Sequence, residues 1–472
     1  MVPLEVEDVI DTLLGAARDK DTVVRWSGAK GIGRMTGRLP RHLGDEVVGA
    51  VLSMFLTDGG SDDGACHGAC LALAELARRG LLLPPRLPQA VPHVLSCLRY
   101  DVRRGSASVG AHVRDAACYV CWALARAYAP EVMAPYVQDL ARGLIVCAAY
   151  DREVNCRRAA SAAFQEHVGR QGAFPHGIDI LTRADYFTVG HRGNSYTQIS
   201  PYIAQFEAYR GALVEHLVER QVRHWDKQIR VLSAQTLRLL VGKEPGLFTE
   251  GVLQRLLDAA LSPDLATRHG SALGVSEVVM GLKECGVALE EGLAARVVGL
   301  VPAIEKARLY RGKGGEVMRA SACRVVECVA RGGLGVINKD VARMMETIDD
   351  NLKHPTPEIQ QAAVSALRGL AAERFELMSD KWQKAKVVDK YVSTVRSEPN
   401  PAARRGFALG LGGLQRSLLC MHLQDVIDAL VHSATVVEEA ADQRDPESRR
   451  NAVLGLVEAV ETVGLGGCYG GE

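Results

Sequence analysis

One short pattern recurs ten times along this chain, and it constrains the fold more than any other feature. In each copy, an arginine or a residue in its place follows a helix-capping residue by four positions and precedes small and apolar residues at helical spacing. Eight of the nine spacings lie between 38 and 51 residues, which is typical of HEAT or armadillo units of about 40–47 residues. The ten anchor positions are Arg25, His67, Arg114, Arg157, Arg230, Arg268, Arg319, Gln360, Arg404 and Arg449.

The residue four positions before each anchor fixes where a helix begins. Nine of the ten are types that an N-cap accepts, with Glu153 as the exception, and such residues satisfy the free N–H groups of the first turn. In three copies proline follows at the first helical position, where it is favoured. The ten positions are Asp21, Asp63, Gly110, Glu153, Asp226, Asp264, Gly315, Thr356, Asn400 and Asp445.

The residue three positions after the anchor is small in nine of the ten copies, and the residue seven positions after it is apolar in all ten. These positions share one face of a helix. A hairpin of two helices cannot bury such a face alone, but stacked neighbours can cover it. We therefore predict an all-α fold, a HEAT/armadillo-type α-solenoid of about ten helical-hairpin repeats with one long inserted loop.

The one irregular spacing, 73 residues between Arg157 and Arg230, marks that inserted loop. We expect repeats over 1–168, an inserted non-repeat segment over 169–199, repeats over 200–464 and a Gly-rich tail over 465–472, as a single continuous solenoid. The insertion is either a brace across the repeats or a binding element, and the sequence favours neither. As a binding element it would offer aromatic and basic contacts. The candidate partner-binding residues are Phe174, His176, Tyr186, Phe187 and Arg192.

The arginines at the anchor positions have two interpretations. We expect them to be structural, pairing with acidic or carbonyl groups in the turns, because a residue that recurs in every repeat serves the scaffold. The alternative is that some of them lie on a concave face and hold an acidic partner. The arginines concerned are Arg25, Arg114, Arg157, Arg230, Arg268, Arg319, Arg404 and Arg449.

Composition argues against several classes of function. Lys+Arg and Asp+Glu both number 56, and a balanced charge is not typical of a nucleic-acid-binding protein. Twelve cysteines lie mostly among apolar residues, which indicates buried thiols in a reducing compartment. No uncharged apolar stretch reaches the length of a membrane span, and the acidic amphipathic start is not a secretory signal.

No catalytic, cofactor-binding or metal-binding constellation stands out. The glycines of KGIGRMTG follow no strand and fall inside a repeat helix, so they do not form a nucleotide-binding loop. Cys66, His67 and Cys70 cluster, as do Cys118 and Cys121. Packing in a buried helix explains both groups better than a zinc site does. We therefore predict no cofactor and no metal, and a scaffold in place of an enzyme.

Longer strings resemble the tubulin-folding cofactor D family. They include DTVVRWSGAKGIGRMTGRLPR (Asp21–Arg41), CLALAELARRGLLLP (Cys70–Pro84), VRDAACYVCWALARAY (Val113–Tyr128) and CRRAASAAFQEHVGRQGAFPHGIDILTRADYFTVG (Cys156–Gly190). The resemblance is strongest over residues 2–280 and weaker to about residue 460. Members of that family are longer than this chain, so we expect a shortened form or a fragment.

The resemblance implies a function that the repeat pattern alone does not. It implies a cytoplasmic, microtubule-associated chaperone that binds β-tubulin after the chaperonin step. It also implies partnership with cofactors E and C and a small Arf-like GTPase in assembling or dismantling the αβ-tubulin heterodimer, with stimulation of GTP hydrolysis by tubulin in the complex. The alternatives are a generic HEAT-repeat adaptor without tubulin activity, and a GTPase activator that acts alone.

Overall fold

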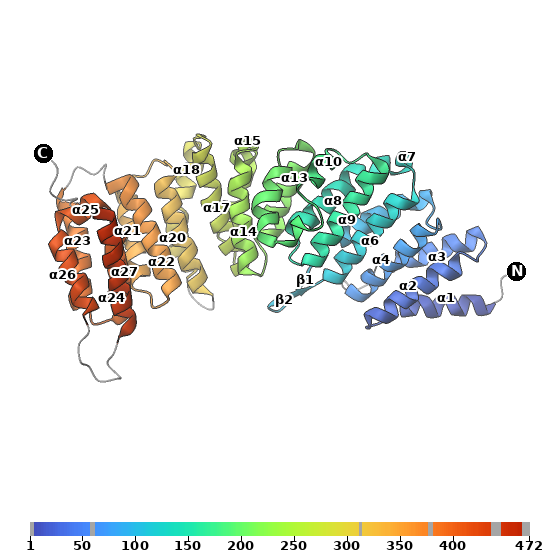
Figure 1. Ribbon diagram of the computed structural model, residues 1–472, viewed down its shortest axis with the longest axis horizontal. Helices are drawn as coiled ribbons and strands as arrows, with labels where there is room; N and C mark the ends of the chain where they lie inside the picture. Colours follow the sequence, from blue (N-terminus) through green and yellow to red (C-terminus); the bar gives the residue numbers. More distant parts are fainter. Residues whose placement is uncertain (1–3, 57–61, 311–313, 376–380, 436–444, 465–472) are drawn as a thin grey trace. The chain divides into compact units, whose positions relative to one another are not determined.

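The computed structural model describes residues 4–56, 62–310, 314–375, 381–435 and 445–464. The tail predicted for residues 465–472 lies outside these ranges. The chain forms two compact units, one of Met1–Gln221 with Trp225–Thr236, and one of Val222–His224 with Leu237–Glu472. Both are built of helical hairpins, as the capped repeat predicts (Figure 1).

In the first unit each hairpin has a first helix that leads into a second helix. The first helices are α1 (Leu4–Ala16), α3 (Arg41–Ser53), α5 (Leu87–Cys97), α8 (Val137–Tyr150) and α13 (Glu207–His216), which η5 (Leu217–Gln221) continues. The second helices are α2 (Thr22–Thr36), α4 (Asp63–Arg78), α6 (Ala111–Ala127) and α9 (Val154–Gln171). These four second helices pack side by side in chain order (Figure 1). Their shared apolar seams form the core of the unit, as the spacing of small and apolar residues requires.

Short elements join these helices. They are η1 (Pro84–Arg86), α7 (Pro130–Met133), η2 (Ala134–Tyr136), α10 (Gly177–Leu181), η3 (Thr188–Gly190), α11 (Arg192–Asn194), η4 (Ser195–Ile199) and α12 (Ser200–Ile203). Helix α14 (Lys227–Val241) follows, and its residues up to Thr236 belong to the first unit.

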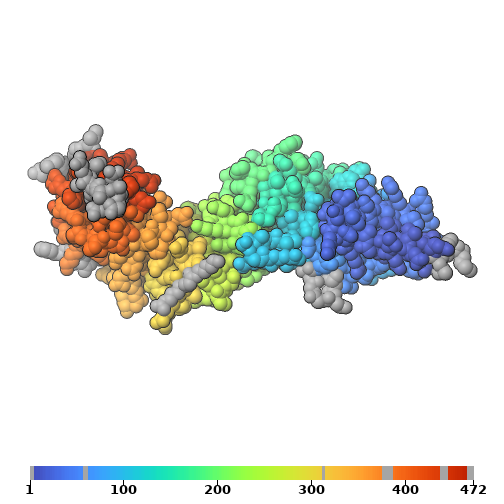
Figure 2. Space-filling model, turned by 90° about the horizontal axis from the view of Figure 1, so that it is seen from below, coloured from blue at the N-terminus to red at the C-terminus, as the bar shows by residue number. Residues whose placement is uncertain are grey.

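A small antiparallel hairpin, which the sequence analysis did not predict, precedes α6. Strand β1 (Val102–Arg104) pairs with β2 (Ala107–Val109), and Gly105 takes the positive φ of 65° that the tight turn needs. The Arg104 guanidinium reaches Asp63 at the start of α4, 3.1 Å away. The hairpin lies at the surface of the first unit, where its light-blue atoms are seen in Figure 2.

The second unit repeats the same plan. Its first helices are α15 (Pro245–Leu247) with η6 (Phe248–Val252) and α16 (Leu253–Ala259), α18 (Glu291–Val298) with α19 (Leu300–Lys306), α21 (Asn338–Leu352), α23 (Lys381–Ser397), and α25 (Arg416–Met421) with α26 (Leu423–Ala434). Its second helices are α17 (Leu265–Glu284), α20 (Gly315–Arg331), α22 (Pro357–Leu370) with η7 (Ala371–Phe375), α24 (Pro401–Gly412) and α27 (Pro446–Val463). Neighbouring second helices pack together from α17 through to α27.

Four of the anchor arginines donate to two carbonyls in the turn before their own helix. The Nη1 atom of Arg25 donates to the carbonyls of Asp19 and Lys20, at 2.7 and 2.9 Å. The carbonyls five and six residues before the anchor receive the same bonds from Arg157, Arg268 and Arg404. Each bond satisfies a carbonyl that the turn would otherwise leave unpaired. These four side chains therefore join the start of the second helix of a hairpin to the turn that precedes it.

Most predicted helix starts coincide with the observed ones, and two differ by one residue. Asp62, not Asp63, caps α4, with its carboxylate accepting from the N–H groups of Gly64 and Ala65. Gly314, not Gly315, is the residue before α20. The chain turns at Gly314 with a φ of +88°, which suits glycine. Each helix that the structure describes is either too short or too polar to cross a bilayer.

One close approach between helices depends on a missing side chain. At Gly68 a Cβ atom would lie 1.7 Å from the carbonyl oxygen of Ala17, well inside van der Waals contact. Glycine therefore lets α4 meet the end of the preceding hairpin, and any larger residue would force the two apart.

Candidate partner-binding surface

The inserted segment is held against α9 by hydrogen bonds to its backbone. Arg157 donates from Nε to the carbonyl of Val189 at 2.7 Å and from Nη2 to the carbonyl of Gly190 at 2.8 Å. The Ser161 hydroxyl donates to the carbonyl of Ala184 at 2.8 Å. All these donors are buried. These bonds fix both ends of the segment from Ala184 to Gly190 to α9.

Phe174 lies inside this packing. Only 4% of the residue is exposed, and its ring centroid lies 4.5 Å from that of His167, stacked, and 5.1 Å from that of Phe164. Tyr209 of α13 donates its hydroxyl proton to the carbonyl of Pro175 at 2.8 Å. Phe174 therefore ties the start of the insertion to α9, and its side chain offers no surface to a partner.

His176 lies at the edge of the same cluster. Its backbone adopts a positive φ of 51°, which is uncommon for a residue with a side chain. The imidazole stacks on Phe206 with the ring centroids 4.2 Å apart, and its Nδ1 atom lies 3.8 Å from Asp179. About half of the side chain remains exposed, so His176 combines a packing role with access to solvent.

Tyr186 and Phe187 project from the insertion. They are 43% and 79% exposed, and their rings meet edge to face at 5.4 Å. The Arg158 guanidinium of α9 lies 5.0 Å from the Tyr186 ring centroid. Asp185 accepts from the N–H groups of Thr188 and Phe187, both at 2.8 Å. The hydrogen bonds from Thr188 contribute most to holding the pKa of Asp185 below its ordinary value, and the bond from the Phe187 N–H adds to this effect.

This turn gives an exposed aromatic pair a rigid base. Two backbone bonds to one carboxylate fix the conformation of the chain around Phe187. A large apolar side chain that is exposed and ordered in advance costs little conformational entropy on binding. Tyr186 and Phe187 therefore have the properties of an interface anchor.

Arg192 lies further along, at the start of α11. Its Nη1 atom is 4.0 Å from a carboxylate oxygen of Asp226, and about a third of its side chain is exposed. The structure thus separates the five predicted residues by environment. Tyr186 and Phe187 project together, His176 and Arg192 are partly engaged, and Phe174 is buried.

The last part of the insertion contributes to a buried polar cluster that the sequence analysis did not predict. The Tyr196 hydroxyl donates to the carbonyl of Tyr150 at 2.9 Å, and Gln221 donates to the same carbonyl at 3.3 Å. The Tyr150 hydroxyl pairs with that of Ser200. Burial raises the pKa of Tyr150 well above its ordinary value. Tyr196 is fully buried, and nothing in the sequence pattern indicates this.

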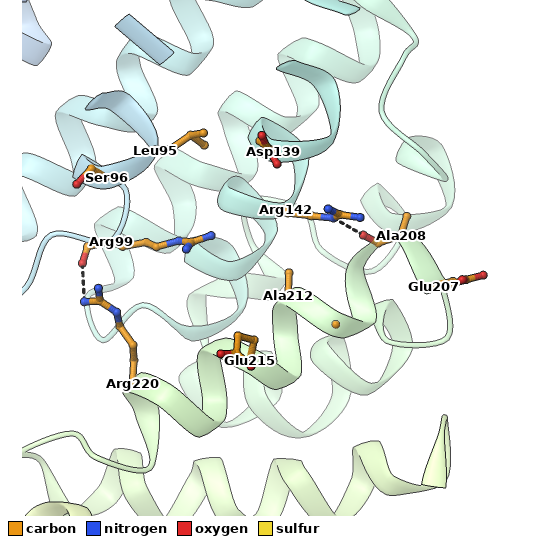
Figure 3. Close-up of a pocket in the computed structure, with 11 residues that line it drawn as sticks. Leu95, Ser96, Arg99, Asp139, Arg142, Glu207, Ala208, Ala212, Glu215 and Arg220 are labelled. Carbon is orange, nitrogen blue, oxygen red and sulfur yellow. Dashed lines mark hydrogen bonds between the residues drawn. The ribbon is translucent and has the colours of Figure 1, made fainter. Parts of the chain in front are cut away.

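A cavity of about 660 Å³ opens over α8, between α5 and α13 (Figure 3). Arg142 donates from Nε to the carbonyl of Ala208 at 2.8 Å, and Arg220 donates to the carbonyl of Arg99 at 3.3 Å. Three arginines and three carboxylates line it together with small residues, so it has no strong charge preference. The lining residues are Leu95, Ser96, Arg99, Asp139, Arg142, Glu207, Ala208, Gly211, Ala212, Glu215 and Arg220.

The cysteine and histidine groups noted in the sequence are packed. Cys66, His67 and Cys70 are buried in α4, and the Nδ1 atom of His67 accepts a hydrogen bond from Nε of Arg25 at 2.8 Å. Across the residues that the structure describes, no three side chains of His, Cys, Asp or Glu are placed to hold a metal ion together. The glycines of KGIGRMTG lie within or just after α2.

Comparisons with known proteins agree with the resemblance seen in the sequence. Residues 1–178 match the family described as "Tubulin-specific chaperone D-like, ARM repeats". The chain is 32% identical to "Tubulin-specific chaperone D" of Dictyostelium discoideum over 93% of this chain and 35% of that protein. It is 32% identical to "Tubulin-folding cofactor D" of Schizosaccharomyces pombe over 52% of this chain and 23% of that protein.

The chain therefore spans about a third or less of the length of these curated relatives. Among solved structures, the crystal structure of Kap121p bound to RanGTP aligns with 97% of this chain and 45% of that chain, at 13% identity and a TM-score of 0.41. The ARM-repeat family match agrees with the all-α HEAT/armadillo-type fold observed here.

Proposed function

We propose that the chain is a member of the tubulin-specific chaperone D family and a scaffold that binds β-tubulin during tubulin folding. The observation that carries the proposal is the 32% identity to a tubulin-specific chaperone across 93% of this chain. Stacked helical repeats suit such a role because they present long surfaces to large partners.

Within this proposal, the chain acts in the cytoplasm, associated with the microtubule cytoskeleton, and takes part in assembling or dismantling the αβ-tubulin heterodimer. Tubulin-folding cofactors E and C and a small Arf-like GTPase are its further partners. The chain contributes binding and not catalysis, and GTP is hydrolysed by tubulin within the assembled complex. Turnover measured with purified tubulin and this chain alone should therefore not exceed that of tubulin by itself.

Of the five candidate partner-binding residues, Tyr186 and Phe187 have the strongest physical support, and we assign them to the contact with the partner. Exposed aromatic anchors on a rigid base dominate many protein interfaces, and truncating one typically costs about 2 kcal/mol or more. Phe187 is 79% exposed, so its truncation should leave the fold intact. Ile337 is also a large exposed apolar residue, at 61%, and lies outside the insertion, so it provides a matched control.

The test is size-exclusion chromatography of the chain with β-tubulin, followed by titration of the complex. We expect co-elution, an affinity at least about thirtyfold weaker for Phe187→Ala, and no change for Ile337→Ala, since 1.4 kcal/mol corresponds to tenfold. If the folded chain does not co-elute with β-tubulin, the tubulin function fails for this chain. The alternative, a generic HEAT-repeat adaptor, would then stand.

A further inference from the structure

The second helices of the first unit carry a cluster of aromatic rings that the function above does not use. Trp26 of α2 lies 5.8 Å from Tyr119 of α6, measured between ring centroids, and Tyr119 lies 5.9 Å from Trp122. All three side chains are partly exposed. Tryptophan and tyrosine at such positions are the residue types most enriched at binding hot spots.

Cationic groups cover these rings. The Lys30 ammonium lies 5.8 Å from the Trp26 ring centroid, and the Arg126 guanidinium lies 4.7 Å from that of Trp122. Both are distances at which a cation is attracted to a ring face. The rings thus hold exposed positive charges in place along α2 and α6.

Two guanidinium groups share one buried carboxylate at the centre of the cluster. Arg78 and Arg79 lie 3.2 and 3.6 Å from oxygens of Glu75, which is 3% exposed. The Tyr119 hydroxyl also donates to Glu75 at 3.0 Å. One carboxylate cannot neutralise two arginines, so this group carries a net positive charge at the surface of α4.

The same arrangement recurs on the next pair of helices. Arg126 of α6 lies 2.8 Å from a carboxylate oxygen of Glu166, and Arg170 of α9 pairs with the same oxygen. About 40% and 47% of the two arginine side chains are exposed. Again two cations meet one anion, and the positive excess extends along the row of second helices.

The second unit provides an internal comparison. Helices α14, α17 and α20 carry a similar ladder there, but in it three arginines meet three carboxylates. The ladder consists of Arg238, Arg324 and Arg331 with Glu277, Glu284 and Glu327. A balanced ladder is therefore compatible with this repeat, so the fold does not demand the positive excess of the first unit.

We propose that this surface of the first unit, the arginine–aromatic ridge of Trp26, Arg78, Arg79, Tyr119, Trp122 and Arg126, binds an acidic, extended segment of a protein partner. The chain as a whole has no net charge, so the local excess is a specific feature of this face. Guanidinium groups pair with carboxylates through charge-assisted bonds. The ring faces of Trp26 and Trp122 are already covered by cations, which leaves little room for the base stacking that single-stranded nucleic acids require.

The test uses a fluorescein-labelled peptide of alternating glutamate and glycine, titrated with the whole chain and followed by fluorescence anisotropy. The Arg78→Gln/Arg126→Gln variant should bind at least about tenfold more weakly, and raising the salt concentration should weaken binding to the unaltered chain. Arg126→Lys keeps the charge and should retain most of the affinity. The Arg18→Gln/Arg41→Gln variant removes the same charge from exposed positions outside the ridge and should bind normally.

Three results would overturn the proposal. They are equal binding of a glutamine–glycine peptide, an equal loss for the Arg18→Gln/Arg41→Gln variant, and tighter ridge-dependent binding of a single-stranded oligonucleotide than of the glutamate peptide. Circular dichroism of each variant shows whether it is folded. Since the probe is a synthetic peptide, the outcome does not depend on whether the partner is tubulin.

Discussion

Acidification should destabilise the first unit through one buried histidine. His67 occupies an anchor position in α4, and its Nδ1 atom accepts a hydrogen bond from Nε of Arg25 at 2.8 Å. The His112 ring lies 5.0 Å away, edge on, and Asp63 lies 3.2 Å from Nε2 of His112. Burial lowers the pKa of His67 to about 3, and the charges of Arg25 and His112 add to the effect. The folded state thus holds His67 neutral.

The magnitude follows from the difference between the folded and unfolded states. An unfolded histidine has a pKa of about 6.5, so below that pH the unfolded chain binds a proton that the folded chain does not. Stability that is present above pH 6.5 is therefore lost as the pH falls toward 3. For a folded pKa of about 3, the loss between pH 7 and pH 5 is about 2 kcal/mol.

The variant His67→Gln isolates this contribution. Its amide oxygen can accept from Arg25, and glutamine already occupies an anchor position at Gln360, where it is buried. Urea unfolding at pH 7 and pH 5, followed by tryptophan fluorescence, should show that His67→Gln loses about 2 kcal/mol less than the unaltered chain. The exposed His42 provides the control, and His42→Gln should behave like the unaltered chain. If the chain and His67→Gln lose the same free energy, the reasoning is refuted.

Two further substitutions test the packing. In urea titrations, Gly68→Ala should lower the unfolding free energy by about 1–3 kcal/mol or more because of overpacking. A Cβ atom added at Gly211 meets nothing within 4 Å, so Gly211→Ala should leave the unfolding free energy unchanged or slightly raised. Asp151→Asn removes the charge that faces buried Arg114 across a two-point contact and should cost about 3–5 kcal/mol in thermal unfolding. Asp179→Asn, at an exposed carboxylate, should cost almost nothing, and equal effects within either pair would contradict the account.

The repeat could be predicted from the sequence because its signals are local. An N-cap such as Asp21 and an anchor such as Arg25 lie within one helical turn of each other, and their spacing reports the helix directly. The hairpin of β1 and β2 was missed because its strands have three residues each. So short a segment has no periodicity to detect.

The surfaces were harder to predict because they join residues from different repeats. Trp26 and Tyr119 are in contact but lie in α2 and α6, and no spacing within one repeat connects them. The same holds for Arg99 and Arg220, which meet at the cavity over α8. Phe174 illustrates another limit of prediction. An aromatic residue in an insertion can contact a partner or belong to the core, and the sequence alone did not distinguish these two positions.

The way the insertion is fastened determines which changes in its length the chain can tolerate. Ala184, Val189 and Gly190 are bonded to α9, and Tyr196 is buried beyond them. Excising the whole segment would uncover apolar surface and leave the Nε and Nη2 donors of Arg157 without their acceptors. Shortening or lengthening is expected to be tolerated chiefly at the Tyr186–Phe187 tip, so new binding preferences could arise there without rebuilding the stack beneath.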